Sequence, residues 1–71
     1  MPELLRFDIG FVGGGSTSGS IVQTEWDRLA KAIAAADDAI IDVPTEGARL
    51  FLRPSHVAWA RLHVRETRVG F

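Results

Sequence analysis

Between residues 5 and 11 the chain alternates between apolar residues and residues of other kinds without a break. The odd positions are apolar, and the even positions are arginine, aspartate and glycine. Because neighbouring side chains of an extended chain point to opposite faces, this period of two predicts a strand with one buried side. The fold must therefore contain a sheet whose core face includes Leu5, Phe7, Ile9 and Phe11.

A glycine- and serine-rich stretch, VGGGSTSGS over residues 12–20, ends this strand. Its composition favours a flexible loop over about 12–20. The lysine that a phosphate-binding loop requires after its last glycine is missing, since the next lysine is Lys31. Backbone N–H groups without bulky side chains can still line an anion site. A small anionic ligand would then meet Gly13, Gly14, Gly15, Ser16, Thr17 and Ser18.

Residues from 24 onward show helical spacing. Thr24 is a helix-capping residue type, and Asp27 follows three positions later. Trp26, Leu29 and Ile33 recur on one face of a helix that we expect to end at Asp37-Asp38.

Three further strands are predicted over residues 39–43, 48–53 and 57–65, with turn residues over 44–47. A short extra strand at residues 21–22 would pair back on the first strand. We predict one small α+β domain over residues 1–71, with the order β-α-β-β-β, an antiparallel-rich sheet whose last three strands form a meander, and the helix packed on one sheet face.

The chain is short for a stable core. A domain of 71 residues buries only about 60% of the surface that its unfolded chain exposes. It has no cysteine, which excludes disulfides and cysteine-ligated zinc. His56 and His63 have no acidic residue directly beside them, so we expect neither a metal nor another cofactor. Self-association is the remaining way to stabilise so small a domain, and a hydrophobic content of 46% agrees with it.

The sequence contains no run of about 20 apolar residues and no basic start followed by an apolar stretch. We therefore expect a cytoplasmic protein. Seven arginines against one lysine, with abundant alanine, indicate a bacterial source with a GC-rich genome.

Charge is unevenly distributed. Residues 1–48 have a net charge of −5 and residues 49–71 a net charge of +4. Such asymmetry bears on partners and not on the fold. Four of the five arginines of residues 49–71 fall on the last two predicted strands.

The helix can cover only one face of the predicted sheet. Besides residues of the first strand, we expect that face to carry Ile41, Val43, Leu50, Leu52, Ala58, Ala60, Leu62 and Val64. The other face would then expose an apolar and aromatic contact surface made by Phe51, Val57 and Trp59, with arginines around it. A joined patch of this kind usually meets a partner.

Three interpretations of this face remain open. In the first, the protein is a homo-oligomeric, non-enzymatic interaction protein that buries the aromatic residues against a second copy. In the second, the same face binds single-stranded nucleic acid by stacking and phosphate contacts. In the third, it is a second core layer of a small closed barrel. The residues for nucleic acid or another anion are Arg49, Arg53, Arg61, His63 and Arg65.

No catalytic arrangement is evident. The serines at 16–20 would need a nearby base, and both histidines lie in the last third of the chain. Asp37 and Asp38 are adjacent and would point to different sides of a helix end. We therefore expect a protein that is not an enzyme.

Overall fold

The computed structural model describes residues 3–64, which form five strands, one α-helix and one short 3₁₀ helix. The α+β class, the antiparallel pairing and the single packed helix are confirmed. The elements are β1 (Leu4–Phe11), β2 (Ser16–Val22), α1 (Gln23–Ala34), β3 (Ile41–Thr45), β4 (Ala48–Leu52), the 3₁₀ helix η1 (Pro54–His56) and β5 (Val57–Leu62).

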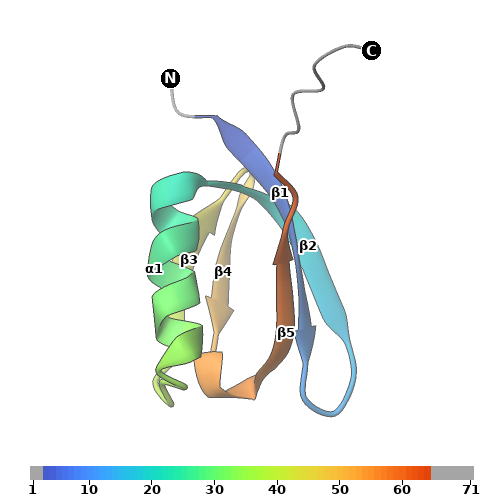
Figure 1. Cartoon of the computed structure of the whole chain (residues 1–71), viewed down its shortest axis with the longest axis vertical. Coiled ribbons are helices and arrows are strands. Elements are labelled where there is room, and N and C mark those ends of the chain that lie inside the picture. The colour runs from blue at the N-terminus through green and yellow to red at the C-terminus, as the bar shows by residue number, and fades with distance from the viewer. Residues whose placement is uncertain (1–2, 65–71) are drawn as a thin grey trace, which may run out of the picture.

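The strands form two antiparallel sheets. One has the order β2-β1-β5, and the other is the hairpin β3-β4. A backbone hydrogen bond of 2.9 Å from Glu46 N to Ser20 O links the hairpin turn to β2. In Figure 1, α1 stands on one side of the molecule and the three-stranded sheet on the other, with the hairpin between them in this view.

The predicted meander is wrong in one respect, because β5 does not pair with β4. Pro54 starts η1, which turns the chain away from the hairpin, and β5 then pairs with β1. Two backbone hydrogen bonds fix the ends of this pairing: Val12 N donates to His56 O at 2.8 Å, and His63 N donates to Arg6 O at 2.8 Å. The first strand is therefore the middle strand of its sheet.

The loop predicted over 12–20 is much shorter in the structure. Gly13, Gly14 and Gly15 all have positive φ and make the turn of the β1–β2 hairpin, and the strand resumes at Ser16. Phe11 N donates to Gly15 O at 3.1 Å and Gly14 N to Phe11 O at 3.0 Å, which closes the turn. Glycine adopts these angles without the steric strain that other residues meet. The segment is thus a tight turn followed by a seven-residue strand.

The helix begins where β2 ends, with no loop between them. Val22 occupies the cap position and no side chain caps the helix, so Thr24 lies inside the first turn and is not the cap that we predicted. The helix ends at Ala34. Beyond it, Asp37 O accepts a hydrogen bond from Ser55 N at 2.8 Å, and Asp38 accepts one from the Ser55 hydroxyl at 2.7 Å. The two aspartates therefore attach the chain after the helix to η1.

The core lies between α1, the hairpin and the inner face of the three-stranded sheet. Trp26 packs its ring 6.1 Å from the ring of Phe7, centroid to centroid. The hydrophobic residues with almost no exposed surface are Phe7, Ile9, Ile21, Leu29, Val43 and Leu52. This agrees with the predicted core face of β1, β3 and β4 and adds Ile21 from β2.

The predicted core assignment fails along β5. Ala58, Ala60 and Val64 are exposed, whereas Val57, expected on the outer face, packs partly buried against the core. The cause is a bulge: Val57 pairs with Phe11 and Trp59 pairs with the preceding Gly10, so two residues of equal parity face opposite sides.

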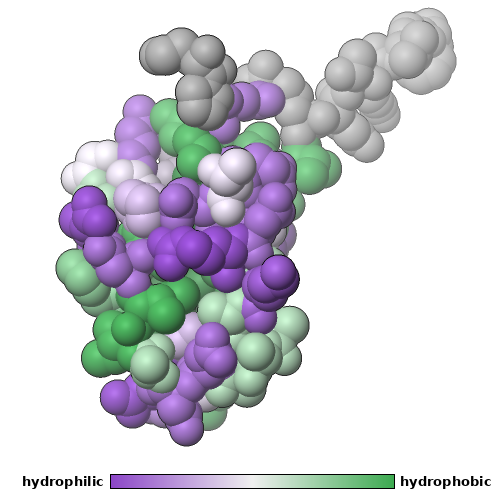
Figure 2. Space-filling view, turned by 90° about the vertical axis from the view of Figure 1, so that its left-hand side faces the viewer, coloured by the Kyte–Doolittle hydropathy of each residue, from purple (hydrophilic) through white to green (hydrophobic). Residues whose placement is uncertain are grey.

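The side of the molecule formed by α1 is shown in Figure 2, where hydrophilic and apolar side chains are mixed over the surface. Ile40, after the helix, keeps 61% of its surface exposed. A shallow hollow between the helix and β3 is lined by Lys31, Ala32, Ala35 and Ile41 among others. In the part of the chain that the structure describes, no helix is long and apolar enough to cross a membrane.

Candidate contact face of the three-stranded sheet

The outer face of the β2-β1-β5 sheet combines residues from three parts of the sequence. Phe7 and Ile9 of β1 are buried, so the alternate residues of β1 point outward. The pairing register places a serine of β2 on one side of each of them and a residue of β5 on the other. The three cross-strand rows are Ser16–Gly10–Trp59, Ser18–Asp8–Arg61 and Ser20–Arg6–His63.

Trp59 lies against Gly10 of β1. Its indole covers Gly10 so closely that a Cβ atom at this position would overlap the ring at Nε1 and Cε2. The guanidinium of Arg61 lies over the ring, 5.4 Å from its centroid, in a cation–π arrangement. Trp59 still exposes 45% of its surface. Glycine at position 10 is therefore required for the tryptophan to rest on the sheet.

Asp8 is the electrostatic centre of this face. Nε2 of His63 lies 2.6 Å from Oδ2 of Asp8, and Nε of Arg61 lies 3.9 Å from the same oxygen. The hydrogen bond with His63 holds the pKa of Asp8 below its ordinary value, and the positive charges of His63, Arg61 and Arg6 act in the same direction. The carboxylate stays ionised and offsets much of the positive charge that β5 brings to this face.

One edge of β5 has no partner strand within residues 3–64, because β5 pairs only with β1. His63 N bonds to Arg6 O, and the direction of the backbone N–H and C=O groups alternates along a strand. Trp59 and Arg61, two and four positions before His63, therefore direct these groups toward β1. Ala60 and Leu62 therefore direct their N–H and C=O groups toward the free edge. An open edge of this kind is a template for pairing with another strand.

The other two predicted contact residues do not join Trp59. Phe51 exposes 64% of its surface, but it lies on β4, in the other sheet. Val57 points toward the core because of the bulge. The predicted aromatic patch is thus divided between two sheets. Of its three residues, only Trp59 lies on the outer face of β5.

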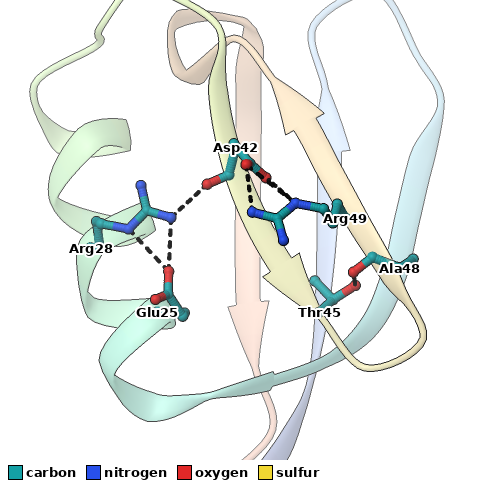
Figure 3. A network of polar contacts seen from close by, with 6 residues as sticks. All are labelled: Glu25, Arg28, Asp42, Thr45, Ala48 and Arg49. Atoms are coloured by element: carbon teal, nitrogen blue, oxygen red, sulfur yellow. Dashed lines mark hydrogen bonds and ion pairs between the residues drawn. The ribbon is translucent and has the colours of Figure 1, made fainter.

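The predicted arginine cluster is also divided. Arg49 lies on β4 and pairs with Asp42 of β3 at 2.7 Å, as Figure 3 shows. This hydrogen bond raises the pKa of Arg49 above its ordinary value. Arg28 of α1 donates to the backbone oxygen of the same Asp42 at 2.6 Å, so this network connects helix and hairpin.

Arg53, just after β4, is exposed and has no ion pair with another described residue. Arg65 lies outside the described residues. Of the residues predicted to contact an anion, the structure therefore brings together only Arg61 and His63.

The serines of the predicted ligand loop are part of the outer face. Ser16 and Ser18 are exposed beside Gly10 and Asp8, whereas Thr17 is half-buried on the inner side of β2. Sequence reasoning missed these serines as neighbours of Trp59. One signal was present: serine occupies every second position from 16 to 20, as on the polar face of a strand.

Within residues 3–64, no three histidine, aspartate or glutamate side chains come together in a way that could hold a metal ion. No hydrogen bond joins a serine to a histidine in that part of the chain; the bond of His63 goes to Asp8.

Comparison of the chain with protein-family models, curated proteins and solved structures finds no match.

Proposed function

We propose that this chain is a small, non-enzymatic cytoplasmic protein that works as a homo-oligomer and contacts its partner through β5. The observation that carries the proposal is the open edge of β5 beside the half-exposed Trp59. Open strand edges are a recurrent route to association, and tryptophan and arginine are enriched at the centres of interfaces.

The small core supports the same proposal. Only six hydrophobic residues of the described chain are almost fully buried, while Leu4, Phe51 and Trp59 are large and exposed. Domains of this size often gain stability by association. The absence of cysteine agrees with a reducing cytoplasm.

Sedimentation equilibrium across a range of concentrations tests the proposal. The wild-type chain should be a dimer or larger at micromolar concentration, and Trp59→Arg should shift it toward the monomer. Ile40→Arg is the matched control, because Ile40 is an exposed apolar residue outside the sheet and its replacement should leave the assembly unchanged. A wild-type protein that remains monomeric at high micromolar concentration would contradict the proposal.

Binding of single-stranded nucleic acid is a second proposal for the same face. Trp59 and Arg61, side by side on an exposed sheet face, favour it, because aromatic and arginine side chains hold bases and phosphates. Asp8 and Asp42 act against it, since they lie close to Arg61 and Arg49. A fluorescence titration with a single-stranded oligonucleotide at low salt decides: quenching that weakens with salt supports binding, and no change at tens of micromolar excludes it.

A further inference from the structure

We infer that two copies of this chain pair their β5 strands antiparallel, about a two-fold axis at Ala60, and so form one continuous six-stranded sheet. The inference rests on the proposed self-association and specifies its geometry. The strand order would be β2-β1-β5 of one copy followed by β5-β1-β2 of the other. Each outer face described above would then continue into the outer face of the partner.

The backbone restricts the possible registers. A hydrogen-bonded pair across the new edge requires two residues whose N–H and C=O groups both point outward, and in the regular part of β5 these are Ala60 and Leu62. Ala58 has the same parity but lies at the bulge. Pairs made by these two residues place a two-fold axis beside residue 60, 61 or 62, and only an irregular pair of Ala60 with Ala58 would place it beside residue 59. The axis beside residue 62 lies at the last residue of β5 and would set Arg61 opposite the partner's His63, another basic side chain. The side chains distinguish the other three registers.

The register centred on residue 61 places the two copies of Arg61 directly opposite each other. Like charges in such cross-strand positions are destabilising. The Asp8 carboxylate is 3.9 Å from Arg61 and also close to His63, so one aspartate in each copy already serves two basic side chains. This register is therefore disfavoured.

The register centred on residue 59 places the two copies of Trp59 opposite each other. Trp59, however, leans onto Gly10 of the neighbouring strand, away from the free edge, and Arg61 covers its other side. A tryptophan pair would require both rings to leave these contacts. It would also centre the pairing beside the bulge, where the strand is irregular.

The register centred on residue 60 avoids both problems. It places Trp59 of each copy opposite the partner's Arg61, and it does so twice because of the symmetry. The partner's Arg61 can take the place over the ring that Arg61 of the same chain holds in a single copy, while the ring stays on Gly10. An arginine over a tryptophan ring is a favourable cation–π pair. At the axis itself, two exposed alanines allow the backbones to approach to normal strand distance.

Cysteine crosslinking distinguishes the three registers, because the chain has no cysteine of its own. In a hydrogen-bonded antiparallel pair the two Cα atoms are about 5.5 Å apart, which a disulfide can span. Ala60→Cys should therefore form a disulfide-linked dimer under mild oxidation, seen on a non-reducing gel. The matched control is Ala58→Cys, another exposed alanine of β5. In this register its two copies are separated by four strand positions, or about 13 Å, and should not crosslink.

Trp59→Cys and Arg61→Cys report the two rival registers, since each would crosslink only when its own residue lies at the axis. Crosslinking at position 59 or 61, or none at 60 in a chain that sedimentation shows to be a dimer, overturns the register and leaves the proposed self-association intact. A monomeric wild-type chain overturns both. Thermal unfolding of each reduced variant establishes that it is folded, and substitution of the exposed Ala60 should change the melting temperature little.

Discussion

The two faces of β1 have opposite environments, one buried and one exposed, because polar and apolar residues alternate along the strand. On the inner face, Phe7 and Ile9 are almost completely buried, and they pack against residues of β2, β3, β4 and α1. The outer face, with Arg6, Asp8 and Gly10, stays open and interacts mainly with β5 and the serines of β2. The comparison shows that the buried core of this domain lies on one side of the strand, whereas the other side stays exposed.

The largest effect should follow from damage to the inner face. Ile9→Ala removes a fully buried side chain from the middle strand and should lower the free energy of unfolding by about 2–5 kcal/mol. Urea denaturation measures this. Ser18→Ala on the outer face serves as the control and should leave the midpoint almost unchanged. A similar loss in both variants would contradict the division between the faces.

Gly10→Ala should have the next largest effect, although it only adds a methyl group to the outer face. The new Cβ would overlap the indole of Trp59, so the ring must leave its place on β1. Overpacking of this kind typically reduces stability by about 1–3 kcal/mol. Near-ultraviolet circular dichroism should report the displaced tryptophan.

The double variant Gly10→Ala, Trp59→Ala provides the control for this prediction. With the ring absent, the added methyl group has nothing to overlap, so the two changes should be clearly non-additive. Additive losses would mean that Trp59 does not rest on Gly10.

The glycine turn determines which residues of β2 reach which face, because a register shift by one residue would exchange them. Gly14 has a φ of 108°, and alanine there should reduce stability by about 1–2 kcal/mol. Ser16→Ala, just beyond the turn, should have little effect. Equal stability of Gly14→Ala and wild type in thermal unfolding would show that the turn adopts another conformation.

The smallest effect should be the pH dependence contributed by Asp8. Its pKa is lowered in the folded protein, so the unfolded chain binds a proton more readily. The stabilisation is present above the ordinary value of 3.8 and is lost as the pH falls through the lowered pKa. Asp8→Asn should therefore flatten the acid side of a plot of unfolding free energy against pH. An unchanged slope would contradict the role of Asp8.

The β1 strand, the helix and the β3–β4 hairpin could all be predicted from sequence, because their patterns are local. Phe7 and Ile9 alternate with polar residues, and Trp26, Leu29 and Ile33 recur at helical spacing. The pairing of β5 could not be predicted in this way. It depends on the turn at Pro54 and on contacts between residues 55 positions apart, such as Asp8 and His63.

The candidate site was predicted only in part, for the same physical reason. Trp59, Arg61 and His63 share a face as expected, since they belong to one alternating strand. Their neighbour Ser18 comes from β2, whose placement only the tertiary fold decides. The glycine-rich composition also concealed β2, because three glycines in a turn and a serine-rich strand together have the composition of a flexible linker.

The central position of β1 also dictates an order of events while the chain is being synthesised. Its hairpin with β2 can close as soon as residue 22 has left the ribosome, because the two strands are separated only by a short turn. Its other side must wait until residues 57–62 have been translated. During that interval, one edge of β1 in the nascent chain is unpaired. Pairing of β5 with this edge is slow because it joins distant parts of the chain, and contact between neighbouring nascent chains would compete with folding at this step.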